Sequence, residues 1–201
     1  STYSDGVSTL REMVEAAKSS GYSYMLITDH SKSAFYADGL DEDRLIQQWK
    51  EVDELNTEMH DFVLFKGIES DILNDGSLDY DRDVLKQFDC IIASVHSNLK
   101  MDLDKAMSRL ITAVENPYTR ILGHCTGRLL LSREGYPVDH KKLIDACISN
   151  GVVIEINANS QRLDIDWQWI DHIMEKDGMV SVNPDAHSVA GIADTKFGII
   201  A

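Results

Sequence analysis

The sequence predicts an α/β fold, a βα barrel in which parallel strands alternate with helices. Two observations predict it. Short apolar segments alternate with longer segments of helical periodicity along all 201 residues. Polar residues also follow strand after strand. An open doubly wound sheet concentrates its ligand site at one switch point, whereas a barrel brings every strand end to one mouth. The repeated strand-end polarity therefore favours the barrel.

The N-terminal elements show how each assignment is made. Leu10, Met13, Val14 and Ala17 recur at helical spacing, and glycine at 21 ends the helix. The apolar segment that follows ends abruptly in a polar pair, which is typical of a buried strand. The same reasoning, with Pro117 and glycine at 151 as further helix ends, predicts helices at 8–20, 41–59, 81–87, 103–115, 138–150 and 167–176, and strands at 22–28, 62–68, 90–95, 120–123, 152–157 and 179–182.

Composition excludes several classes of protein. The hydrophobic fraction of 43% and the charged fraction of 26% are ordinary for a globular domain and give no membrane span. The three cysteines are few and widely spaced, and no signal peptide opens the chain, so we expect a cytoplasmic protein. The net charge of −15 argues against a general nucleic-acid-binding surface, because phosphate backbones are held by clustered lysine and arginine. We expect one domain, residues 1–201.

Acidic and histidine side chains share one position, just past a strand. One such histidine alone is most often a hydrogen-bonded structural residue. Four of the seven histidines lie there, however, and a barrel would bring them within reach of common metal ions. The histidines at 60, 140 and 172 fall on helices and are expected at the surface. The strand-end set is Asp29, His30, Glu69, His96, His124, Asp185 and His187.

Mixed imidazole and carboxylate ligands suit Zn, Mn or Fe. A carboxylate such as Glu69 can bridge two ions. Two ions about 3.5–4 Å apart can clamp a phosphoryl group and activate a water. The sequence therefore predicts a multinuclear metal site for phosphoester hydrolysis, and we assign catalytic roles to Glu69, His96, His124 and Asp185.

Two arginines fall in loops on the same predicted mouth. Arg128 follows the strand before His124, and Arg162 follows the next strand. Arginine suits bidentate phosphate contact, so both are candidate substrate-binding residues. The alternative is that each pairs with a nearby acid such as Glu134 or Asp164.

Several segments resemble the ordered motifs of the polymerase and histidinol phosphatase (PHP) superfamily. The form is most similar to the C-terminal PHP domain of bacterial family X DNA polymerases. The resemblance covers essentially the whole chain, and the combination of motifs is specific. The segments are Ser1-Thr-Tyr-Ser-Asp-Gly6, Thr28-Asp-His-Ser31, Gly67-Ile-Glu69, Ala93-Ser-Val-His-Ser97, Gly123-His-Cys-Thr-Gly127 and Asp185-Ala-His187.

The resemblance implies a distorted seven-stranded, TIM-like βα barrel with a trinuclear site. Glu69 would bridge two metals, His96 and His124 would complete one, and Asp185 would join the other. Asp5, His30 and His187 would hold the third metal. The implied cofactors are up to three divalent ions of Mn, Zn or Fe.

One departure from the family pattern concerns the first strand. The family opens with a His-X-His pair directly before the position that Ser1 matches, so we expect that pair and its strand to be missing from this chain. The chain would then be a fragment whose barrel is open between its first and last strands. The metal position shared by Glu69 and Asp185 would lack its histidine pair, and the fragment would be inactive.

The resemblance implies a parent polymerase, with the polymerase domain upstream, whose PHP domain hydrolyses phosphodiesters at DNA 3′ ends. Two alternatives stay open. One is a phosphatase of small monoesters of the histidinol phosphatase type, which the acidic surface suits better. The other is a non-catalytic, metal-stabilised structural module.

Overall fold

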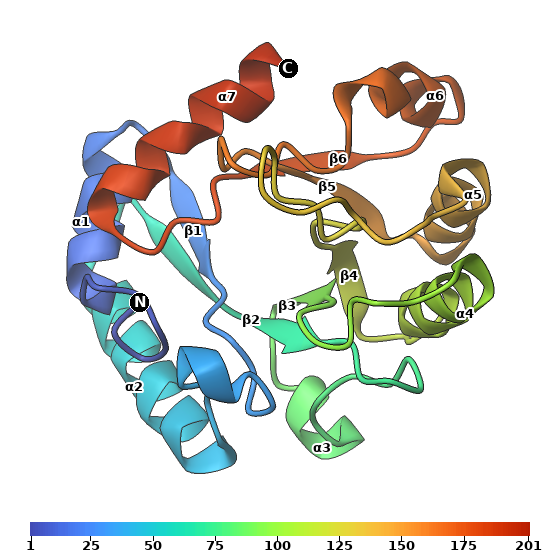
Figure 1. Ribbon diagram of the computed structural model, residues 1–201. Helices are drawn as coiled ribbons and strands as arrows, with labels where there is room; N and C mark the ends of the chain where they lie inside the picture. Colours follow the sequence, from blue (N-terminus) through green and yellow to red (C-terminus); the bar gives the residue numbers. More distant parts are fainter.

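The computed structural model describes residues 1–201 and contains one sheet of six parallel strands. The strands lie in chain order and each pairs in parallel with the next. The sheet is curled, with helices along its outer face (Figure 1). The strands are β1 (Tyr24–Ile27), β2 (Val63–Asp71), β3 (Cys90–Ser94), β4 (Thr119–Leu122), β5 (Val153–Asn157) and β6 (Val180–Asn183).

The helices follow the strands in alternation. Most carry a side-chain cap that accepts from their first backbone N–H groups, as Asp41, Asp102 and Asp139 do. None of the helices is long and apolar enough to cross a membrane. The helices are α1 (Leu10–Ser19), α2 (Glu42–Glu58), α3 (Arg82–Leu85), α4 (Leu103–Val114), α5 (His140–Asn150), α6 (Ile170–Glu175) and α7 (Thr195–Ile200), with short 3₁₀ helices η1 (Phe35–Ala37), η2 (Trp167–Trp169) and η3 (Val189–Asp194).

The predicted alternation of strands and helices is confirmed, with two differences. β2 continues through Glu69 to Asp71, whereas the sequence predicted that it ends at residue 68. The rule that an acid ends a buried strand fails here because these acids meet histidines inside the barrel. The helical segment from Val189 to Ile200 was not predicted; it packs on α1 and β6.

The sheet is a partial barrel, because β1 and β6 are not hydrogen-bonded to each other. A cavity of about 870 Å³ lies inside the curl. It is lined by Tyr24 and Phe65 near the start of the strands and by Glu69 and His187 at their ends. The six parallel strands fit a TIM-like barrel that lacks one strand, and a seventh strand stays a prediction.

Two hydrophobic cores support the sheet. The larger lies under α4 and α5 and includes Ile68, Ile91 and Leu122. The smaller joins α1, α2 and the start of the sheet around Val14 and Leu64. Fully burying each such side chain contributes on the order of 1.5–3 kcal/mol, so the strand ends are held on a rigid base.

Candidate metal centre

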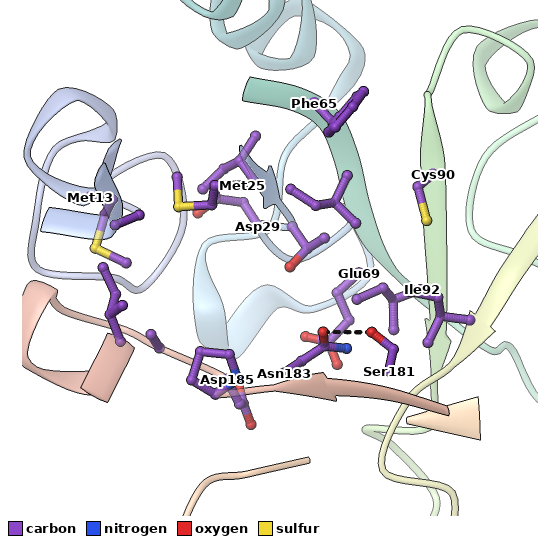
Figure 2. Close-up of a pocket in the computed structure, with 18 of the residues that line it drawn as sticks. Met13, Met25, Asp29, Phe65, Glu69, Cys90, Ile92, Ser181, Asn183 and Asp185 are labelled. Carbon is purple, nitrogen blue, oxygen red and sulfur yellow. Dashed lines mark hydrogen bonds between the residues drawn. The ribbon is translucent and has the colours of Figure 1, made fainter. Parts of the chain in front are cut away.

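The strand ends bring seven predicted ligands into one connected group. Glu69 lies at its centre. Its Oε1 atom lies 3.0 Å from Nε2 of His124 and 3.1 Å from Nε2 of His96, and its Oε2 atom lies 3.4 Å from Nδ1 of His30. Figure 2 shows Glu69 pointing toward β6, the strand that carries Ser181 and Asn183, with Asp185 just beyond its end. One carboxylate thus faces histidines from three other strand ends.

The other half of the group centres on Asp5. Its Oδ1 atom lies 3.5 Å from Nε2 of His187 and 3.9 Å from Nε2 of His30. Asp185 Oδ1 lies 3.7 Å from Nδ1 of His187. His30 is therefore shared between the two halves, facing Glu69 through one ring nitrogen and Asp5 through the other.

Backbone pairing explains how these side chains meet. His30 forms a parallel bridge with Glu69, which continues the β1–β2 register past the end of β1. The N-terminal loop is tied to the last strand end, because the N–H of Val7 donates to the carbonyl of His187 at 2.8 Å. This bond places Asp5 beside His187 although they are far apart in sequence.

His124 is placed by a close approach of two strands. Gly123 donates its N–H to the carbonyl of Ala93, and a Cβ at this position would overlap Ser94 Oγ and lie 2.8 Å from Ile92 Cγ2. Glycine is therefore required for β4 to end this near β3. The histidine that follows points its ring at Glu69.

The donor set and its spacing fit divalent metal ions. The Nε2 atoms of His96 and His124 lie 3.2 Å from each other. Both atoms also lie at nearly the same distance from Oε1 of Glu69. A proton can join only one such pair at a time. An ion with ligands at about 2.1 Å in tetrahedral geometry separates neighbouring ligand atoms by roughly 3.4 Å. The observed spacings of 3.0–3.2 Å are a little shorter than this and also fit hydrogen bonds, so these three atoms can hold either a cation or a shared proton.

The electrostatics of the site also favour a cation. Burial alone would lower the pKa of His96, but the carboxylates of Glu69 and Asp71 outweigh it and raise this pKa to about 10. Burial would raise the pKa of Glu69, yet His96 and His30 hold it well below its usual range. The carboxylates thus attract positive charge to the imidazoles, as protons or as metal.

The chain is similar to several known proteins. No family model matches the chain. The chain is 44% identical over 201 residues to the DNA polymerase/3′-5′ exonuclease PolX of Bacillus subtilis, which covers all of this chain and 35% of that protein. It is 33% identical over 101 residues to a probable phosphatase of Caldanaerobacter subterraneus, which covers 48% of this chain and 37% of that protein. This chain belongs to the PHP superfamily.

A solved structure shows the same fold. The histidinol phosphate phosphatase of Lactococcus lactis, complexed with zinc, L-histidinol and phosphate, superimposes with a TM-score of 0.65 and 16% sequence identity. The match covers 100% of this chain and 90% of that chain. The PHP domain described here thus spans a little over a third of the two relatives above and nearly all of this structural neighbour.

Asp71 belongs to the site of the PHP domain, although the sequence did not predict it. Its carboxylate contacts Nδ1 of His96, on the side of the ring away from Glu69, and accepts from Ser33 Oγ at 3.2 Å. Such a carboxylate fixes the tautomer of a ligand histidine and orients its ring. The signal was present in the sequence, because Asp71 follows Glu69 by two residues and strand side chains alternate faces.

Glu155 is a second residue that sequence reasoning missed. It lies on β5 inside the barrel, where Oε2 accepts the N–H of His124 at 2.7 Å and Oε1 accepts from Asn183 at 2.9 Å. Burial raises the pKa of Glu155 to about 7, against the opposing effect of His124. Glu155 therefore supports the backbone of a ligand and sits outside the ligand group itself.

The two predicted substrate arginines differ in their surroundings. The guanidinium of Arg128 is fully engaged: it donates to Asp166 at 2.7 Å and to the carbonyls of Arg162 and Leu163. Arg162 donates through Nε to Asp185 at 3.2 Å, and one of its terminal nitrogens is buried without a partner. Each arginine pairs with a nearby acid, as the alternative expected, although the acids are Asp166 and Asp185 rather than Glu134 and Asp164. Arg162 is the nearer of the two to the candidate ligands, because it pairs with Asp185.

Proposed function

We propose that this PHP domain is a metal-dependent phosphoesterase that hydrolyses phosphodiesters at DNA 3′ ends, within a longer polymerase of the PolX type. One observation carries the proposal: seven acidic and histidine side chains from the N-terminal loop and five strand ends form one connected group, and five of them line the cavity inside the sheet. A structural zinc site usually closes its coordination with four ligands. This group has more donors than that and lies at a mouth.

The ligand roles follow the two halves of the group. Glu69, His96 and His124 would hold one ion, and Asp5, His30 and His187 a second. Asp185, with Glu69, would share a third position. When bound, such ions polarise phosphoryl oxygens and lower the pKa of a water. The donors leave Mn, Zn and Fe open, because all three accept nitrogen and oxygen ligands.

The chain's own residues orient the substrate and the ligands. Arg162 is held beside the candidate ligands by its ion pair with Asp185, and we assign it the phosphate contact because of that position. Asn157 donates to the same Asp185 oxygen at 3.1 Å, which leaves the other oxygen free. Arg128 braces the loop that carries Arg162 and acts on substrate through that residue. We keep Arg128 as a positioning residue in this proposal.

The test uses the full-length protein with 5′-labelled single-stranded DNA and Mn. We expect a ladder of products shortened from the 3′ end, lost on chelation. His124→Ala should remove the activity, and His60→Ala, an exposed histidine before β2, should retain it. The absence of any metal-dependent product, or a full ladder from His124→Ala, would refute the proposal.

A small-molecule phosphatase is the second candidate. The net charge of −15 favours it, and so do the probable phosphatase and the histidinol phosphate phosphatase among the similar proteins. Release of phosphate from histidinol phosphate without any shortening of DNA would select this function. If chelation lowers the melting temperature while neither substrate reacts, the domain is instead a metal-stabilised structural module.

A further inference from the structure

Two consecutive aromatic residues are exposed, and the ring of the second lies directly beside the metal centre. Phe35 and Tyr36 lie on η1, shortly after His30, and are 88% and 67% exposed. The ring of Tyr36 lies 5.9 Å from the ring of His30 and 6.4 Å from that of His96. Single exposed apolar residues are common, but two consecutive exposed aromatic residues, one of them against the ligand histidines, mark a contact surface.

The turn that carries the rings is held firmly. Ala34 and Ala37, on either side of the pair, are fully buried. The N–H groups of Ala37 and Gly39 both donate to the carbonyl of Ala34, and Gly39 has no room for a side chain. Arg44 donates to the carbonyl of Asp38 at 2.8 Å. The rings therefore cannot fold back into the core and remain available to a ligand.

The charge of the surroundings limits what can bind there. The chain carries a net charge of −15, and Asp5, Glu69 and Asp71 all lie near Tyr36. Charge attraction to a phosphate backbone is correspondingly weak away from the metals and Arg162. A neutral, flat group can still stack on an aromatic ring, because every nucleobase has a π-face.

We propose that Phe35 and Tyr36 form a stacking subsite for the base of the nucleotide whose phosphate is cleaved, an inference that rests on the proposed function. Tyr36 lies within about one nucleotide's reach of the ligand histidines, so it meets the 3′-terminal base rather than a distant one. Stacking accepts any base but requires one that is unpaired. Single-stranded and frayed 3′ ends should therefore be preferred over paired ends.

The first experiment compares two oligonucleotides in the full-length protein with Mn, one ending in a normal 3′ nucleotide and one ending in an abasic nucleotide. The wild type should show a KM roughly tenfold lower for the normal end, the effect expected of one stacked base. Phe35→Ala/Tyr36→Ala should abolish this difference with kcat changed less than about twofold. Tyr36→Phe should keep the difference. Ile46→Ala should keep it too, because Ile46 is an exposed apolar residue on α2 outside the cavity.

The second experiment separates this inference from the proposed function. In a His124→Ala background with Mn, a DNA strand with 2-aminopurine at its 3′ end should lose fluorescence on binding as the base stacks. The loss should disappear in the double variant. If DNA is shortened but neither KM nor fluorescence responds to the double variant, the subsite is wrong and the proposed function stands. If no DNA is shortened, the proposed function fails, and the fluorescence result alone decides the subsite.

Discussion

Gly123→Ala tests whether the close contact of β3 and β4 holds His124 in place. The new Cβ would overlap Ser94 Oγ and lie 2.8 Å from Ile92 Cγ2, closer than packed carbon atoms approach. Overpacking of this kind costs about 1–3 kcal/mol. The variant should lose that much free energy of unfolding in a urea titration at fixed metal concentration. It should also bind metal more weakly, because His124 follows directly.

Ser94 supplies the matched partner for this experiment. Its buried hydroxyl has no hydrogen-bond partner, so Ser94→Ala alone should change stability by no more than about 0.5 kcal/mol. In the double variant the overlap with Oγ is gone and only the Ile92 contact remains. A double-mutant cycle should therefore give a coupling of about 1 kcal/mol or more. Additive effects of the two substitutions would show that this contact does not position the strand.

Three further predictions concern the charges of the site. Asp71→Asn should lower the pKa of His96, so that fewer protons leave the site when Mn binds. Calorimetry of Mn binding in buffers of different ionisation enthalpy measures this number of protons. The wild type and the control Asp61→Asn, at an exposed carboxylate, should both release more. Glu155 has a folded-state pKa of about 7, so its protonated form stabilises the fold below about pH 4.5 and this contribution is lost as the pH rises through 7. Glu155→Gln should therefore flatten the pH dependence of the free energy of unfolding of the metal-free protein over that window. An unchanged slope would contradict this reasoning. Chelation should lower the melting temperature of the wild type and have a much smaller effect on Glu69→Gln, measured by calorimetry.

The sequence predicted the fold well because the fold depends on local patterns. Alternating apolar segments and capped helices locate each strand within a few residues. The long β2 strand is the exception. The prediction assumed that an acid ends a buried strand. In the structure Glu69 and Asp71 pair with β3, and their side chains face buried imidazoles. An acid can lie inside a strand when a cation balances it, and that balance comes from other strands.

The site was predictable in proportion to how local its geometry is. His96 and His124 directly follow strands, and their meeting at Glu69 follows from parallel strands alone. Asp5 came only from the family resemblance, because a loop hydrogen bond to the far end of the chain places it. Asp71 was missed because β2 was predicted to end before it, although its two-residue spacing from Glu69 was a usable signal, and the exposed ring of Tyr36 was missed because it lies in a loop. Such contacts need the three-dimensional register.

The acidic character of the chain and its proposed substrate can be reconciled at the metal centre. The carboxylates of the ligand group lie close together, and without cations their repulsion would oppose both folding and the approach of a phosphate. Protonation of His96 relieves part of this repulsion. Bound metal would relieve more of this repulsion. Within a few ångströms of the ions, the site would then attract a phosphate instead of repelling it. Because salt screens exposed charges beyond about 10 Å, such a site can recognise one phosphate without holding a long nucleic-acid backbone. This suits an activity at the end of a strand rather than within a duplex.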